Sequence, residues 1–445
     1  MDRFIFFTSK KIVFFFIFIL TPFQWLIFSK VLGLAIKPVH VALLLVYVIA
    51  IFSFRFKAWG QLFQGYSAIF ILLRGMYSLW YVLSLAWSND ISTALPIVIK
   101  DIIYFGFFLI FTILVTDLVQ NDKFIEIAGL ASTIGVLVFV AYFIFVFHRL
   151  GRNLYSEYYR AIISMDINAL MRSFYPTIFN FSLTGNPVET VFLTSLRNTV
   201  MGTFIIYMIL LSIWKNTLKN NTNKILVFAI IVLCVVLVLT SVSRSNIIVL
   251  GVSLFLPFFI RAIHKKKYRK KKIQNFFAIL AIAVTTLFVF FISDISQWDL
   301  FLSLANVLYE RLSAITTDPR LLMYKETFAQ ISNHILLGSG IGVQLQSGEF
   351  GSGRIHNVFL SSWIETGLVG MVLSLAWYLS IIIVLLKTII SHKSWQSNIS
   401  RDWVTALPIL PLLRALVSGG GGFTLIEWLA LALFFGISNG IKQPA

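Results

Sequence analysis

The stretch Arg320–Gly370 contains His356 and two arginines, side chains that can carry out proton transfer and bind anions. His356 stands two residues after Arg354, at the point where a long apolar run begins. A histidine can take a proton from a hydroxyl group near neutral pH. An arginine guanidinium matches phosphate geometry and can neutralise the charge that develops on a departing diphosphate. A base together with guanidinium groups suits glycosyl transfer from a lipid diphosphate to a hydroxyl acceptor.

Two more arginines occupy positions from which they can face the same site. Arg244 is at the centre of the short polar turn Thr240–Asn246, and Arg197 begins an apolar run from the same predicted side of the membrane. Simpler interpretations stay open for all of these residues. A lone arginine in a tight turn can extend its head group to water. His356 can instead cap a helix or lie at the membrane interface, and loop arginines can pair with loop carboxylates.

The sequence does not contain the residue patterns of a metal site. The chain has one cysteine, Cys234, and its predicted external segments hold neither an Asp-x-Asp motif nor a histidine pair. Cysteine clusters and histidine pairs are typical of zinc sites, and carboxylate clusters are typical of calcium and magnesium sites. We therefore expect a reaction that uses no metal ion and no cofactor.

The composition defines the class of chain that must position these residues. Of the 445 residues, 58% are hydrophobic and only 12% are charged, whereas soluble proteins are about 25% charged. A water-soluble fold of this length has too little interior for so many apolar side chains. The composition excludes a soluble enzyme, a disordered chain and a disulfide-stapled domain, and it predicts an all-α polytopic membrane protein.

About 20 mostly apolar residues are needed to cross the hydrocarbon core of a bilayer, and the sequence contains twelve candidate runs. They lie near residues 12–29, 33–54, 61–86, 94–117, 124–147, 196–214, 225–242, 245–261, 274–293, 357–386, 403–417 and 423–440. With the N-terminus in the cytoplasm, most of the 36 Lys and Arg residues fall in short cytoplasmic segments, as the positive-inside bias requires. Both termini are then cytoplasmic. The basic run 261–272 is interpreted as a topology anchor near anionic lipid rather than a nucleic-acid site.

Residues 1–445 are predicted to form a single transmembrane domain with two large external loops, 148–195 and 294–355. The second loop contains an amphipathic helix over 320–337. Long loops in compact membrane proteins usually carry function, and both of these loops are rich in arginine. The positive-inside bias does not require these arginines on the external side. We therefore expect them to bind an anionic substrate there.

Five charged residues fall inside the predicted spans: Arg74, Lys100, Asp101, Arg414 and Glu427. Charge within a bilayer is costly, so these side chains are expected to face the protein interior or a wet cavity. Lys100 and Asp101 are neighbours in the chain, and two interpretations of the five residues stay open. The residues can form a structural ion network, or they can line a path for lipid phosphate or protons.

The motifs over residues 240–370 resemble those of the O-antigen polymerase and O-antigen ligase superfamily. His356-Asn357 followed by Glu365-x-Gly367 and Gly370 is similar to the superfamily's HN…E-x-G-x-x-G signature, and its spacing is similar to the H-x10-G element of ligases. Arg244 with Ile248 resembles an R-x3-L element, with Ile in place of Leu and Ser245 in place of Gly. Arg320 followed by the run 338–342 resembles the R…G-x-G segment that precedes the histidine.

This resemblance implies an inverting, metal-independent glycosyltransferase of a GT-C-like architecture in a bacterial inner membrane, with its site on the periplasmic side. The implied partners are a donor oligosaccharide on undecaprenyl diphosphate, a glycan acceptor, membrane lipids and a chain-length regulator, with no nucleic acid. The implied roles are a catalytic base at His356, diphosphate binding by arginines, and a structural or supporting role at Glu365 and Asn357. The diphosphate-binding candidates are Arg244 and Arg320, followed by Arg197 and Arg354.

Three activities remain open at this point. A polymerase adds the chain to a second lipid-linked repeat, and two arginine-bearing loops suit two diphosphate substrates. A ligase adds it to lipid A–core, which the H-x10-G spacing suits. The departures at Ser245 and Ile248 favour the polymerase. The third alternative is a transporter of lipid-linked glycan that uses the intramembrane charges.

Overall fold

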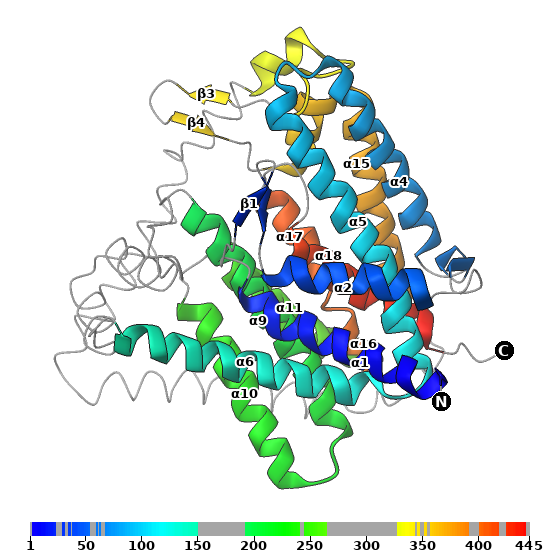
Figure 1. The fold of residues 1–445 in the computed structure, drawn as a ribbon, viewed down its shortest axis with the longest axis vertical. Helices are drawn as coiled ribbons and strands as arrows, with labels where there is room; N and C mark the ends of the chain where they lie inside the picture. Colours follow the sequence, from blue (N-terminus) through cyan, green and yellow to red (C-terminus); the bar gives the residue numbers. More distant parts are fainter. Residues whose placement is uncertain are drawn as a thin grey trace.

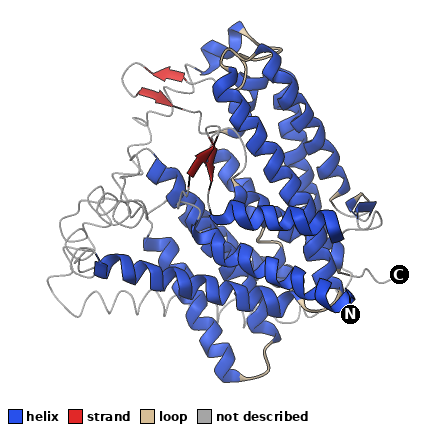
Figure 2. Cartoon of the chain, in the orientation of Figure 1, coloured by secondary structure: helices blue, strands red, loops and turns tan. Residues whose placement is uncertain are grey.

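The computed structural model is a predominantly helical molecule with two small β-hairpins (Figures 1 and 2). It describes residues 2–23, 29–31, 34–36, 38–53, 59–60, 62–63, 67–149, 192–240, 244–264, 327–342, 345–347, 351–353, 357–390, 400–417 and 424–441. The α-helices are α1 (Asp2–Leu20), α2 (Pro38–Ser53), α4 (Ala68–Leu83), α5 (Ile91–Gln120), α6 (Phe124–Arg149), α9 (Phe192–Thr217), α10 (Asn221–Thr240), α11 (Arg244–His264), α15 (Val358–Ile390), α16 (Arg401–Val404), α17 (Ile409–Val417) and α18 (Leu425–Gly440). Two 3-10 helices, η1 (Thr21–Phe23) and η2 (Ser84–Trp87), follow α1 and α4.

The strands form two antiparallel hairpins that the all-α prediction did not include. β1 (Ser29–Val31) pairs with β2 (Leu34–Ile36), and β3 (Leu345–Ser347) pairs with β4 (Gly351–Gly353). Both hairpins lie in connections between helices, so the helical class of the fold is unchanged.

Six helices of the described chain are long and apolar enough to cross a membrane. They comprise residues Ala68–Trp87, Ile91–Gln120, Phe124–Phe145, Val200–Thr217, Asn221–Leu239 and Val358–Ile390. Shorter apolar helices occupy Val39–Val48, Ser245–Arg261 and Leu425–Gly440. The chain is thus a multi-pass membrane protein. The total of twelve spans stays a prediction, and the candidate at 274–293 lies outside the described residues.

Several predicted boundaries were wrong. The candidate run at 403–417 is divided into α16 and α17, because Pro408 has no backbone N–H with which to continue the helix. The run predicted from residue 33 begins as strand β2, and its helix starts at Pro38. Helices α6 and α9 extend into the predicted first external loop at both of its ends. The amphipathic helix predicted over 320–337 is described as helical at 327–333 and is followed by turns.

Helix α18 lies at the centre of the molecule and packs along α5 (Figure 1). Two glycines one turn apart permit this close approach. A Cβ atom at Gly436 would lie 2.6 Å from Val115 Cβ, and one at Gly440 would lie 2.7 Å from Val119 Cβ. Small residues at this spacing let helix backbones meet in a membrane, where van der Waals packing drives association. Helix α18, in which every residue except Asn439 is buried, thereby becomes a support for the outer helices.

Two ion pairs join helices at positions that the predicted topology places near the cytoplasmic side. Lys10 Nζ on α1 is 2.7 Å from Asp117 Oδ2 on α5. Arg261 Nε on α11 is 2.8 Å from Asp402 Oδ2 on α16. Both pairs join segments far apart in the sequence, so they fix the relative height of the helices that carry them.

Candidate functional site

The structure describes the predicted site residues to different extents. His356, Arg354 and Arg320 lie outside the described residues. The backbones of Arg244 and Arg197 are described: Arg244 begins α11, and Arg197 is in the second turn of α9. The predicted site is therefore located through the elements that flank it.

Asn357 caps the N-terminus of α15. Its side-chain Oδ1 accepts hydrogen bonds from the backbone N–H groups of Phe359 (3.0 Å) and Leu360 (3.1 Å). An Asn in this position satisfies donors that have no partner within the helix. His356 directly precedes this cap in the chain. The N-terminus of α15 is the positive end of the helix dipole, where an anionic group is stabilised.

Helix α15 has a break three turns after this cap, at Gly367. This residue has φ 73° and ψ −172°, which is not a helical conformation. Glycine adopts such a positive φ more readily than any other residue. A Cβ atom at Gly367 would lie 1.9 Å from the carbonyl oxygen of Leu336. A glycine is thus required at this position for two reasons: its backbone has a positive φ, and a second segment leaves no space for a Cβ atom.

The segment that approaches the break is residues 335–341, which contains part of the glycine-rich run seen in the sequence. We call residues 335–341 and 364–368 together the break region. Backbone hydrogen bonds join its two halves: Ser339 N–H to Ile364 C=O (2.6 Å), Gly340 N–H to Glu365 C=O (3.1 Å) and Leu368 N–H to Ile335 C=O (2.9 Å). These bonds supply partners to backbone groups near the interruption, which would be costly to leave unpaired in a membrane.

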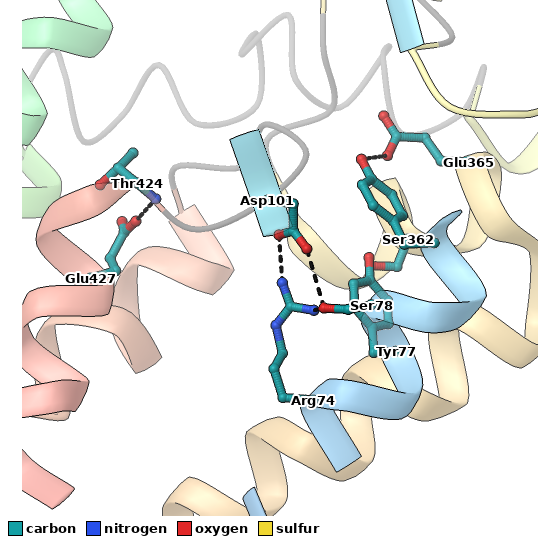
Figure 3. A network of polar contacts seen from close by, with 9 residues as sticks. Arg74, Tyr77, Ser78, Asp101, Ser362, Glu365, Thr424 and Glu427 are labelled. Atoms are coloured by element: carbon teal, nitrogen blue, oxygen red, sulfur yellow. Dashed lines mark hydrogen bonds and ion pairs between the residues drawn. The ribbon is translucent and has the colours of Figure 1, made fainter. Parts of the chain in front are cut away.

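Glu365, one of the motif residues, is buried at the interface of α15 and α4. The hydroxyl group of Tyr81 on α4 donates to Glu365 Oε2 at 3.2 Å. One turn away, the hydroxyl groups of Tyr77 and Ser362 are 3.0 Å apart (Figure 3). The geometry places the carboxylate of Glu365 in a network between helices.

Deeper along α4, Arg74 forms an ion pair with Asp101 on α5 and donates to Ser78 at 2.6 Å (Figure 3). The rings of four aromatic residues surround its guanidinium at 4.9–5.5 Å: Tyr77, Phe105, Trp377 and Trp428. Aromatic faces attract a cation, and the carboxylate neutralises it. Arg74 is only 2% exposed. This geometry favours the structural interpretation of the pair.

Lys100 and Asp101 are adjacent in the sequence, but their side chains have different neighbours in the structure. Adjacent residues on a helix point about 100° apart, so they face different neighbours. Asp101 points to Arg74, whereas the Nζ of Lys100 lies 5.6 Å from the ring centre of Tyr104. The Tyr104 hydroxyl is itself 3.3 Å from Nε2 of His40 on α2.

A second buried ion pair joins α17 and α18. Arg414 Nη1 is 3.4 Å from Glu427 Oε1. The other oxygen of Glu427 accepts from the backbone N–H of Thr424, so the same carboxylate caps α18 (Figure 3). A Cβ atom at Gly202 on α9 would lie 3.2 Å from Arg414 Nη1. Gly202 thus lets α9 pack directly against this pair.

The helices that carry or flank the predicted site residues meet around α17. Both α15, which follows His356, and α11, which begins with Arg244, contact α17. Helix α9, which carries Arg197, contacts α11 and reaches Leu410 on α17 through Gly202. The structure therefore gathers these helices into one bundle. Within the described residues, no group of three or more His, Cys, Asp or Glu side chains is arranged to hold a metal ion.

Sequence reasoning missed the contribution of α4. Its residues Arg74, Tyr77 and Tyr81 are buried at positions i, i+3 and i+7, which is the spacing of one helix face. Polar and aromatic residues on one face of an otherwise apolar helix indicate that this face packs against polar groups of another helix. Which helix it meets could not be read from the pattern.

These features define a multi-pass helical membrane protein with a polar network at the interface of α4 and α15. Comparison with known families makes the assignment more specific. Residues 228–375 match the family model described as O-antigen ligase. This match supports the resemblance to the O-antigen ligase and polymerase superfamily that the sequence motifs indicated. No curated protein gives a significant match to the chain.

Proposed function

We propose that this protein is a membrane glycosyltransferase that moves an oligosaccharide from undecaprenyl diphosphate to an acceptor sugar hydroxyl. The observation that carries the proposal is the O-antigen ligase match over 228–375, a segment that contains both Arg244 and His356. Members of this family process glycans, which agrees with such a transferase in broad terms. The proposed location is a bacterial inner membrane, with both termini cytoplasmic and the site on the periplasmic side.

The proposed chemistry is a single inverting displacement. The imidazole of His356 accepts the proton of the acceptor hydroxyl while that oxygen attacks the anomeric carbon. The bond from the anomeric carbon to the diphosphate oxygen breaks, and its electron pair leaves with the lipid diphosphate. Arg244 and Arg320 bind this diphosphate and stabilise its charge, with Arg197 and Arg354 as additional contacts. Glu365 and Asn357 support the site without touching the substrate.

We propose that the acceptor is a second lipid-linked repeat unit, so that the enzyme is a surface-polysaccharide polymerase. The arginine-rich external segments suit two diphosphate-bearing substrates. The alternative is an O-antigen ligase acting on lipid A–core, favoured by the spacing of His356 and Gly367 and by the description of the matched family. A transporter is less favoured, because the buried pair of Arg74 and Asp101 is neutralised within the protein.

The test is a reaction with purified protein in detergent. The donor is offered with a second lipid-linked repeat or with lipid A–core, and the acceptor that is consumed separates polymerase from ligase. His356→Ala and Arg244→Ala should each abolish transfer while the protein still accumulates. His334→Ala is the matched control, since His334 is an exposed histidine in the described part of the same segment. Full transfer by His356→Ala would contradict the assignment of His356 as the base. If the intact protein transfers sugar to neither acceptor, the proposal that it is a glycosyltransferase is contradicted.

A further inference from the structure

Three tryptophans donate their indole N–H groups to backbone carbonyls of the break region. Trp80 donates to Thr366 at 2.9 Å, Trp87 donates to Leu337 at 2.7 Å, and Trp363 donates to Ile335 at 3.2 Å. Tryptophans near a membrane surface usually direct this polar edge towards the headgroup region. Here each indole nitrogen instead holds a chain segment in place.

Two of these donors come from a distant part of the sequence. Trp80 is in the last turn of α4, and Trp87 ends η2, whereas their acceptors lie on the two halves of the break region. Ser88 adds a third contact from the same place, because its hydroxyl group donates to the carbonyl of Ile341 at 3.0 Å. The end of α4 therefore holds α15 and residues 337–341 at the same time.

The held segment leads to His356 by a short route. Gly342 is three residues before Leu345, which pairs with Gly353 across the β3–β4 hairpin. Gly353 is in turn three residues before His356. On its other side, His356 adjoins Asn357, which caps the same helix that contains the break. The chain on each side of His356 therefore leads to a point attached to α15: Ser339 and Gly340 before it, and Asn357 after it.

We propose that Trp80 and Trp87 are positioning residues of the transferase, acting through the break region on the segment that carries His356. The inference rests on the proposed function. In this role the two indoles act through their hydrogen bonds to the break region and do not touch the substrate. A displacement of about 1 Å at a catalytic group can lower a rate by about 100-fold, so loss of these hydrogen bonds should appear in kcat.

The experiment removes the N–H donors in two ways. Trp80→Phe, Trp87→Phe and the double variant are compared with site-specific benzothienylalanine at either position, which keeps the ring shape and substitutes sulfur for the N–H. The matched control is the same pair of changes at Trp214, which packs its ring against Gly129 between α9 and α6. Each protein is assayed for kcat, for KM of the lipid-linked donor and for the amount of donor bound per protein.

We expect kcat of the double variant to fall by about 10- to 100-fold, with donor KM and donor-binding capacity within twofold of wild type. The Trp214 controls should keep the wild-type kcat. An unchanged kcat in the benzothienylalanine proteins would overturn the proposal. So would a fall in kcat matched by an equal fall in binding capacity, because that result means fewer folded molecules.

The same assays separate this proposal from the proposed function. If His356→Ala is inactive but the Trp80 and Trp87 variants turn over at the wild-type rate, the positioning role alone fails. If His356→Ala transfers normally, the catalytic assignment fails, and with it the route through which the two tryptophans were proposed to act.

Discussion

The hydroxyl group of Tyr81 on α4 donates a hydrogen bond of 3.2 Å to the carboxylate of Glu365 on α15. The two residues are separated by 284 positions in the sequence, and each belongs to a helix long enough, with its flanking turn, to cross a membrane. Glu365 is 3% exposed, so its carboxylate depends on protein donors for stabilisation. The pair joins α4 to the motif-bearing part of α15.

Glu365→Ala should destabilise the protein because it removes the buried hydrogen bond that Tyr81 donates to this carboxylate. Loss of a hydrogen bond to a charged group costs about 1.5–3 kcal/mol. Glu365→Gln keeps an oxygen acceptor and should cost clearly less. The measurement is the unfolding midpoint of each protein in detergent. Equal destabilisation by Ala and Gln would show that the contact with Tyr81 does not contribute.

Gly367→Ala should be strongly destabilising, since the residue has φ 73° and an added Cβ would meet the Leu336 carbonyl at 1.9 Å. The backbone conformation alone costs about 1–3 kcal/mol for a residue with a Cβ, because it lies in a region that essentially only glycine adopts. The matched control is Gly251→Ala in α11, where a Cβ meets nothing within 4 Å. A glycine inside a helix is weaker than alanine by about 0.5–1 kcal/mol, so this control should be neutral or stabilising. Accumulation in the membrane and the unfolding midpoint report both effects, and a well-folded Gly367→Ala protein would contradict the described break.

Removing one partner of the Arg74–Asp101 pair should be more harmful than removing both. Arg74→Met or Asp101→Leu leaves a buried charge without its partner, at a cost of about 3–5 kcal/mol. The double variant removes both charges and should recover much of the loss. A double-mutant cycle on unfolding free energies measures this coupling. If the two single losses simply add, the pair is not coupled in the way that its geometry indicates.

The N-terminus of α5 offers a prediction about pH. Hydrogen bonds from Ser92 and Thr93 lower the pKa of Asp90 from its ordinary value of 3.8 to about 2, and Asp90 caps the helix by accepting from the Thr93 N–H. A carboxyl group with a lowered pKa stabilises the fold above pH 3.8, and this contribution is lost as the pH falls towards 2. Asp90→Asn should therefore lower the unfolding midpoint at pH 7, with the difference from wild type shrinking between pH 4 and pH 2. A difference that is constant over this range would contradict the assignment.

Local features of the sequence predicted much of the architecture. Apolar runs of sufficient length predicted most of the helices, because the bilayer requires each spanning segment to satisfy its own backbone hydrogen bonds. The motif around His356 and Gly367 predicted the family that the 228–375 match supports. The same local reasoning was wrong about the run at 403–417, where Pro408 divides one expected span into α16 and α17.

Partners of the charged and polar groups were decided by tertiary structure. Asp101 is next to Lys100 in the chain, yet it pairs with Arg74, because a helix turns adjacent side chains towards different neighbours. The run 338–342 was recognisable in the sequence as a family-like segment, but only the fold brought Ser339 and Gly340 to the interruption at Gly367.

The sequence by itself determined that this chain is a polytopic helical membrane protein with an O-antigen ligase-like segment, because hydropathy and motif spacing are local properties. Only the tertiary structure decided that α4 supports α15 through Tyr81, Trp80 and Trp87. Such contacts depend on which helix faces pack together. In a membrane that choice is made by shape complementarity and by the pairing of buried polar groups, since apolar surface alone does not distinguish one neighbouring helix from another.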